Sequence, residues 1–123
     1  DLREVAQVLL EEEGAVVTAV SNGREAVKLF SSHPEGTFDV ILMDIMMPLM
    51  DGYEATRQIR KLDRTDASSI PIIALTANAF AEDVRHALDC GMNAHLAKPL
   101  DVEKMIHTIA CYCSRVCISH CKK

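Results

Sequence analysis

The stretch that decides the fold is DVILMDIMMPLMDG, residues 39–52, an apolar run that stops at one carboxylate, Asp44. Such a run is typical of a strand covered on both faces, as in a parallel sheet layered between helices. Pro48 and Gly52 then indicate a turn. We therefore predict a strand over residues 38–43 that delivers Asp44 to the edge of the sheet rather than to its interior.

Two patterns of apolar residues alternate along the rest of the chain. Spacings of three and four residues predict helices with one buried face, and short apolar runs predict strands. The predicted inward helical residues are Leu2, Val5, Ala6 and Leu9; Ala26, Val27 and Phe30; Ala55, Ile59 and Leu62; Val84, Ala87 and Leu88; and Val102, Met105, Ile106, Ile109 and Cys113. The predicted strands cover residues 15–20, 38–43, 70–75 and 94–97. This alternation indicates an α/β domain with parallel, right-handed crossovers.

Capping residues mark three of the helix starts. Asn22 with Glu25, and Asp51 with Glu54, have the spacing in which a side-chain oxygen accepts a hydrogen bond from the backbone three residues on. Asp101 is placed to cap the last helix in the same way.

Length, composition and charge restrict the class of protein. A chain of 123 residues with 49% hydrophobic and 25% charged residues is ordinary for one globular domain. No apolar run approaches the roughly 20 residues that cross a bilayer, and no secretory signal is visible, so we expect a cytosolic setting without membrane contact. The net charge of −5, with no basic stripe beyond the last two lysines, argues against nucleic acid and favours a protein partner.

The five cysteines do not suggest a disulfide framework, because their number is odd and the core is large. Cys113, Cys117 and Cys121 recur every four residues beside His120, so a metal clip is an alternative to helical packing of thiols. We expect the domain to cover residues 1–113, with 114–123 as a helix extension or tail.

Polar residues collect where the predicted strands end. In an open parallel sheet, ligands bind outside the carboxyl ends of the strands, and these positions hold Asp44, Thr76 and Lys98. A carboxylate such as that of Asp44 can accept a phosphoryl group. The negative charge of this group would be offset by the Lys98 ammonium, by a hydrogen bond from the Thr76 hydroxyl and by a Mg²⁺ ion bound by oxygen ligands. The chain has neither a glycine-rich phosphate loop nor a nucleophile elbow. The alternatives are a loop-capping Asp44, a strand-forming Thr76 and a solvated Lys98.

Three segments, DVILMDIMMPLMDGYEATRQIR, IPIIALTAN and GMNAHLAKPLD, resemble the receiver domain of two-component response regulators. The resemblance covers nearly the whole chain and is nearest to receivers of hybrid sensor histidine kinases. It implies a flavodoxin-like, three-layer α/β/α fold whose family strand order is 2-1-3-4-5.

The resemblance also implies a role for each site residue. Asp44 would accept the phosphoryl group from a phosphohistidine of a histidine kinase or histidine phosphotransfer domain. Asp44 and the backbone carbonyl of Met46 would bind Mg²⁺. Thr76 would be the switch hydroxyl and Lys98 the phosphoryl-binding cation, joined to Pro99 by a cis peptide bond.

Two features depart from the family pattern. His95 stands where the family has an aromatic switch residue, and it is either a half-buried surface residue or a pH switch. The family's first strand and its acidic pair would lie upstream of Asp1, so we expect impaired Mg²⁺ binding. We also expect either that residues 15–20 pair with the strand at 38–43, or that another chain adds a strand in a homodimer.

Three functions fit the sequence. The first is a phosphoacceptor in a two-component phosphorelay, in which the parent protein is a hybrid sensor kinase. The second is a phosphorylation-incompetent receiver that serves as a docking or dimerisation module. The third is a flavin-binding domain, which the aromatic content of 4% disfavours.

Overall fold

The computed structural model describes residues 2–45, 50–76, 81–97 and 100–112. In these ranges the elements follow in the order α1 (Leu2–Glu12), α2 (Gly23–Ser32), β1 (Ile41–Asp44), α3 (Gly52–Arg60), the 3-10 helix η1 (Thr65–Ala67), β2 (Ile72–Thr76), α4 (Ala81–Asp89), β3 (Ala94–Ala97) and α5 (Val102–Tyr112). None of the helices described is long and apolar enough to cross a membrane.

The three strands form a parallel sheet in the order β1-β2-β3. Ile41 lies opposite Ile72 at one end, and Thr76 lies opposite Ala97 at the other. All five residues of β2 are buried, because this strand has a neighbour on each side and helices on both faces. The predicted parallel α/β sheet is thus confirmed for these three strands.

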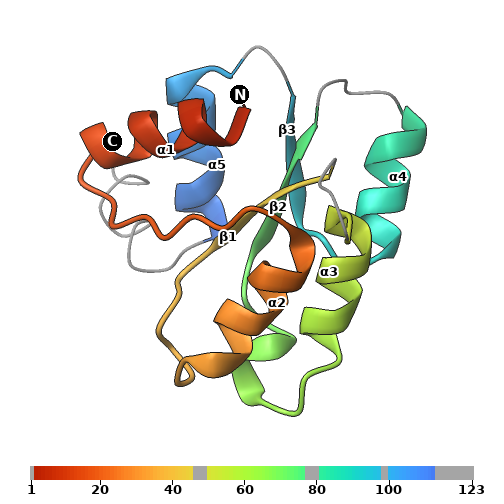
Figure 1. Ribbon diagram of the computed structural model, residues 1–123. Coiled ribbons are helices and arrows are strands. Elements are labelled where there is room, and N and C mark those ends of the chain that lie inside the picture. The colour runs from red at the N-terminus through yellow and green to blue at the C-terminus, as the bar shows by residue number, and fades with distance from the viewer. Residues whose placement is uncertain (1, 46–49, 77–80, 98–99, 113–123) are drawn as a thin grey trace.

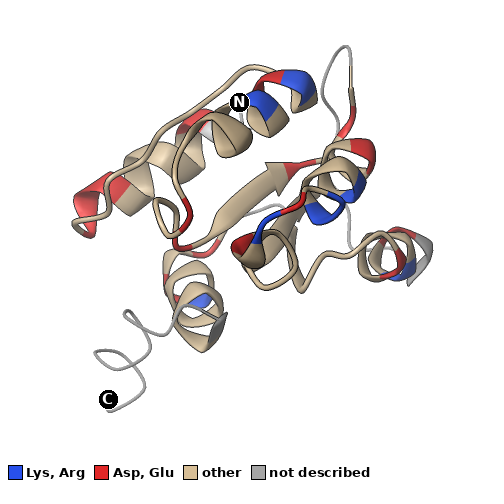
Figure 2. Ribbon diagram, turned by 90° about the horizontal axis from the view of Figure 1, so that it is seen from below, with Lys and Arg blue, Asp and Glu red and all other residues tan. Residues whose placement is uncertain are grey.

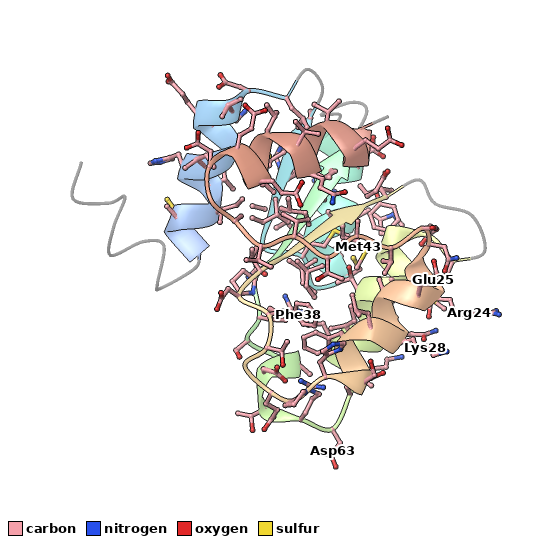
Figure 3. The ribbon with its side chains drawn as sticks, turned by 60° about the vertical axis from the view of Figure 1, so that its left-hand side comes forward. Arg24, Glu25, Lys28, Phe38, Met43 and Asp63 are labelled. Atoms are coloured by element: carbon pink, nitrogen blue, oxygen red, sulfur yellow. The ribbon has the colours of Figure 1, made fainter. Side chains whose placement is uncertain are left out.

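The helices form two layers around the sheet (Figure 1), with α2, α3 and α4 on one face and α1 and α5 on the other. Successive strand residues point to opposite faces, so the sheet contributes to two separate cores. The first core contains Phe30, Met43, Ile45, Ala55, Ile59, Ala67, Ile70, Ile72, Ala74, Ala87, Cys90 and Met92. The second contains Ala6, Leu10, Ile73, Leu75, Leu96, Met105 and Ile109. Figure 3 shows Met43 on the inner side of α2, whereas Arg24 and Lys28 project outward from that helix.

The predicted strand at residues 15–20 is wrong. This segment lies between α1 and α2 with no regular secondary structure and does not belong to the sheet. Val17 packs against the second core, but Val16 is 99% exposed. High β propensity alone does not make a strand, and β1 pairs only with β2 among the described strands. The expected pairing of this segment with the strand at 38–43 is therefore wrong as well.

The helix faces agree with prediction in most places. Phe30, Ala55, Ile59, Ala87, Met105 and Ile109 are buried as expected. Val5 and Leu88 are 47% and 54% exposed, so their predicted burial is wrong. The buried stripe of α1 instead runs through Ala6 and Leu10, one turn apart. The side chain of Leu2 and residue Cys113 lie outside the described part of the chain.

The predicted helix caps are confirmed. Asn22 Oδ1 accepts a hydrogen bond from the Glu25 backbone at 2.9 Å, and the Glu25 carboxylate accepts one from the Ser21 backbone at 3.0 Å. Asp51 Oδ1 accepts from the Glu54 backbone at 2.9 Å. Asp101 caps α5 through the backbone N–H of Lys104, at 3.3 Å. These bonds satisfy amides at the first turns of α2, α3 and α5 that have no helical acceptor.

Candidate functional site at the strand ends

Asp44 and Thr76 are the last residues of two adjacent parallel strands. Asp44 lies opposite Leu75, and the ladder continues through a 3.2 Å hydrogen bond from the Ile45 backbone to the Leu75 carbonyl. Strand spacing and rise place the Cα atoms of Asp44 and Thr76 roughly 6 Å apart. Asp44 is half-buried and Thr76 is 5% exposed. The predicted convergence of these two residues at one edge of the sheet therefore holds at the level of the backbone.

The third strand brings its own end to the same edge. β3 ends at Ala97, opposite Thr76, and Lys98 is the next residue in the sequence. Lys98, Pro99 and Met46 all lie outside the described residues, and their roles stay predictions. His95 is half-buried on β3 opposite Ala74.

Two glycines, Gly52 on α3 and Gly23 on α2, allow these helices to approach the end of β1 closely. A Cβ atom on Gly52 would lie 2.5 Å from the carbonyl oxygen of Asp44, a backbone atom that cannot move aside. The Gly52 N–H donates to the Ile45 carbonyl at 3.0 Å. On α2, the Gly23 N–H donates to the Met50 carbonyl at 3.1 Å, and a Cβ there would overlap that carbonyl. Together the N-termini of α2 and α3 hold both ends of the segment that follows Asp44.

This role of Gly23 and Gly52 was not predicted from the sequence, where Gly52 indicated only a turn and Gly23 had no assigned role. A signal was present, because each glycine stands at or just after a helix-capping residue, Asn22 or Asp51. The capping motif predicts the helix start, but which carbonyl the helix will touch is decided by tertiary packing.

The described residues fit a Mg²⁺ ion only in part. Asp44 supplies one carboxylate at the strand ends, and Mg²⁺ commonly uses one or two carboxylates while keeping several waters. Among the described residues, no group of three or more Asp, Glu, His or Cys side chains is arranged to hold a metal ion. Asp44 is thus suited to be one ligand of a set that these residues do not complete.

A surface depression lies away from the strand ends. It is open, has a volume of about 610 Å³, and is lined by Glu35, Leu62, Asp63, Arg64, Thr65 and Ser68. Figure 3 shows Asp63 at the end of the molecule opposite the arrowhead of β1. Arg64 is already engaged there, because Asp66 binds its guanidinium through two oxygens at 2.6 and 3.0 Å. This depression does not contain the strand-end residues Asp44 and Thr76.

Contacts between α3 and α4 also affect ionisable groups. The Tyr53 and His86 rings stack with centroids 3.8 Å apart. Burial, followed by the nearby Asp83 carboxylate, raises the pKa of Tyr53 above its ordinary value, so the phenol keeps its proton. Burial also raises the pKa of the Cys90 thiol, which donates to the Ala87 carbonyl at 3.2 Å. These groups are therefore neutral packing elements at neutral pH.

The fold and the strand-end residues define a doubly wound α/β domain whose candidate site lies at the carboxyl edge of its parallel sheet. The family model for the response regulator receiver domain matches residues 1–110. The chain therefore belongs to the response regulator receiver domain family, and the predicted flavodoxin-like fold is confirmed.

Sequence relatives include histidine kinases from plants and bacteria. The chain is 38% identical to Histidine kinase 1 of Arabidopsis thaliana over 88% of its length, and 41% identical to the sensor protein GacS of Pseudomonas syringae pv. syringae over 85%. It spans only 11% of the length of each of these proteins. The match is therefore to one domain of much larger relatives.

A solved structure gives the same result for the fold. The receiver domain of the sensor histidine kinase PA1611 from Pseudomonas aeruginosa PAO1 is 37% identical, with a TM-score of 0.78. The alignment covers 89% of this chain and 86% of that one. That crystal structure has a magnesium ion coordinated in its active-site cleft.

Proposed function

We propose that Asp44 of this receiver domain accepts a phosphoryl group from a phosphohistidine in a two-component phosphorelay. The single observation that carries the proposal is the position of Asp44 at the end of β1, beside the strand that ends in Thr76. A half-buried carboxylate at the carboxyl edge of a parallel sheet is accessible to a donor and is held by regular backbone on one side.

The chemistry needs one bond to form and one to break. A carboxylate oxygen of Asp44 attacks phosphorus, and the bond between phosphorus and the imidazole nitrogen of the donor breaks as that nitrogen takes up a proton. The Thr76 hydroxyl is proposed to donate a hydrogen bond to a phosphoryl oxygen, and the Lys98 ammonium to offset its charge. Mg²⁺, when bound, would further neutralise the phosphoryl oxygens.

The partner and the setting are further parts of the proposal. The relatives named above are histidine kinases, so a histidine kinase or histidine phosphotransfer domain is the proposed donor, and a hybrid sensor kinase the proposed parent protein. We place this domain in the cytosol, on the cytosolic part of that kinase if it is membrane-bound. Asp44 and the backbone carbonyl of Met46 are the proposed Mg²⁺ ligands.

The docking-module alternative is less well supported. The family match extends through residue 110, and Asp44 and Thr76 occupy adjacent strand ends, which a docking role does not require. Dimerisation can still accompany phosphoryl transfer. We propose that the open edge of β1 pairs with another copy of the chain, or exchanges a strand with it, since β1 has one neighbour among the described strands.

Phosphorylation by a small acyl phosphate in the presence of Mg²⁺ tests the phosphoacceptor proposal. We expect one phosphoryl group per chain, observed by intact-protein mass spectrometry and lost on treatment with base. Asp44→Asn should abolish the incorporation, because an amide is not a nucleophile for this step. The matched control is Asp63→Asn, an exposed residue at the far end of the molecule, which should incorporate as wild type does. Incorporation that persists in Asp44→Asn would exclude Asp44 as the acceptor.

A further inference from the structure

Tyr53 on α3 and His86 on α4 form a ring stack that joins two helices on the same face of the sheet (Figure 1). Their ring centroids lie 3.8 Å apart, and the ring planes are 13° from parallel. Tyr53 is half-buried and His86 is exposed. Over their described lengths, the backbones of α3 and α4 are not closely packed against each other, whereas α2 packs closely against α3. The stack is therefore a side-chain contact between two helices whose backbones stay apart.

The α3 end of this contact is fixed to the backbone of Asp44. Gly52, the residue before Tyr53, donates its N–H to the Ile45 carbonyl at 3.0 Å. A Cβ on Gly52 would lie 2.5 Å from the Asp44 carbonyl oxygen, so the start of α3 directly touches the end of β1. Because this junction has no free space, the first turn of α3 keeps its position relative to Asp44. A relative movement of α3 and α4 must therefore come from α4.

The far end of α4 is held by a different contact. The Gly91 carbonyl, just after this helix, accepts hydrogen bonds from Nε and Nη2 of Arg60 at 3.0 and 2.8 Å. The other end of α4 is Ala81, and this helix is the next described element after β2, which ends at Thr76. A displacement of α4 that starts from the Thr76 end would leave Gly91 in place. It would instead change the overlap of the two stacked rings.

We propose that the Tyr53–His86 stack couples the state of Asp44 to the position of α4. This inference rests on the proposed phosphoryl transfer, in which the Thr76 hydroxyl donates to a phosphoryl oxygen. That hydrogen bond pulls the end of β2 toward Asp44 and displaces the start of α4, so the stack, which is formed in the unmodified chain, opens. Opening requires little rearrangement, because His86 is already exposed and no buried side chain has to leave the core.

Such a coupling is reciprocal. If a phosphoryl group on Asp44 opens the stack, the stack opposes the phosphorylated state by the same free energy. A variant without the stack should therefore bind a phosphoryl mimic more tightly than wild type does. Coupled sites commonly change each other's affinity by roughly 5–150-fold, and a single exposed ring contact should give a gain near the lower end of that range.

The first test is the proton NMR spectrum of the His86 ring in the full 123-residue chain. The Tyr53 ring current displaces these signals while the rings are stacked. Saturation with beryllium trifluoride and Mg²⁺, a stable mimic of a phosphoryl group on a carboxylate, should abolish the displacement and the cross-peaks between the two rings. His33 at the end of α2 is the internal reference, because its ring centroid lies 5.4 Å from that of Phe38 and this contact should not change.

The second test is the dissociation constant of the same mimic, measured by fluorine NMR of its bound form. His86→Ala removes the stack at an exposed position and should bind the mimic several-fold more tightly. Tyr53→Leu should give the same gain, because it removes the same contact. Tyr53→Phe keeps the ring, and Leu88→Ala changes another exposed residue of α4, so both should bind as wild type does.

The outcomes separate this inference from the proposed function. A stack that is unchanged when the mimic is bound would overturn the coupling and leave the acceptor role of Asp44 intact. Equal or weaker binding of the mimic by His86→Ala and Tyr53→Leu would overturn it as well. If neither the mimic nor an acyl phosphate modifies Asp44, the proposed function is wrong, and the coupling is wrong with it.

Discussion

Arg60 uses every N–H of its guanidinium to hold two connecting segments together, the one before β2 and the one before β3. Its Nε and Nη2 donate to the Gly91 carbonyl at 3.0 and 2.8 Å, and Nη1 donates to the carbonyls of Ala67 and Ile70 at 3.1 and 2.7 Å. Nη2 also donates to Asn93 Oδ1 at 2.9 Å. Burial lowers the pKa of Arg60 below its ordinary value, yet the group remains charged at any physiological pH. All four acceptor atoms are neutral, so this arginine has a structural role.

We predict that Arg60→Ala lowers the free energy of unfolding by about 2–4 kcal/mol, because it leaves several half-buried carbonyls without a donor. The measurement is the urea midpoint at constant slope. Lys61→Ala, the exposed neighbour, should change stability by less than about 0.5 kcal/mol. A loss of the same size in both variants would mean that the effect comes from α3 itself and not from the loops that Arg60 joins.

Single residues also show which parts of the site were predictable. Asp44 and Thr76 were predicted because a strand-end position follows from local pattern and from the topology of parallel sheets. The contacts of Arg60 were not predicted, since its acceptors lie up to 33 residues away in the sequence. An arginine in an amphipathic helix gives no sign of whether it faces solvent or three backbone carbonyls.

At the scale of elements, the three strands that form the sheet were predicted close to their observed places. The prediction at 70–75 became Ile72–Thr76, and that at 38–43 became Ile41–Asp44, each shifted toward the carboxyl end. Helix starts were predicted correctly because capping is local, and the Asn22 and Asp51 bonds are both formed. The segment 15–20 has the composition of a strand, but membership of a sheet depends on tertiary context, which composition does not report.

The junction between β1 and α3 gives the second prediction. A Cβ on Gly52 would overlap the Asp44 carbonyl, so Gly52→Ala must push α3 away from the end of β1. We expect a loss of about 1–3 kcal/mol in stability and slower acyl phosphate labelling of Asp44. Gly14→Ala is the comparison, because its Cβ would meet nothing within 4 Å and only its positive φ of 92° would be strained.

Gly14→Ala should thus lose stability without a change in labelling rate under conditions where it is folded. Equal labelling rates of Gly52→Ala and wild type would show that the strand end tolerates displacement. Stability would be measured by thermal unfolding and labelling by the mass shift of the intact chain.

At the scale of the whole molecule, one end of the sheet holds the candidate site and the other holds arginine contacts that join loops. Asp44 and Thr76 lie at the carboxyl ends of the strands, whereas Arg60 and Arg64 join loops at the other end. Arg64 donates to the carbonyls of Phe30 and His33 at 2.9 Å and lies 4.5 Å above the Phe30 ring. Figure 2 shows Lys and Arg segments beside Asp and Glu segments on the same helices, a mixed charge pattern across the described part of the chain.

The Arg64–Asp66 pair predicts how stability depends on acid. The side chains are 13% and 19% exposed, and the hydrogen bonds from Arg64 lower the pKa of Asp66 below its ordinary value of 3.8. A carboxylate with a lowered pKa in the folded state stabilises the fold fully above its ordinary pKa. That contribution is lost as the pH falls through the lowered pKa that Asp66 has in the folded state, because the folded state then also takes up the proton.

We therefore expect the stability difference between wild type and Asp66→Asn to be constant above about pH 5 and to shrink as the pH is lowered through the acidic range. Urea unfolding at a series of pH values measures it. Asp63→Asn, at an exposed position in the same loop, is the control for a general charge effect. A difference that stays constant down to pH 2 would show that the ionised form of Asp66 does not stabilise this loop.

The unshared side of β1 has a consequence for handling the protein. Among the described strands β1 pairs only with β2, and an apolar strand at the edge of a sheet is a template on which further chains can add. Val16, which is 99% exposed, adds apolar surface. Concentrated solutions should therefore aggregate slowly, and light scattering would measure the increase in particle size with time. A single lysine placed on the outer side of that strand should slow the growth.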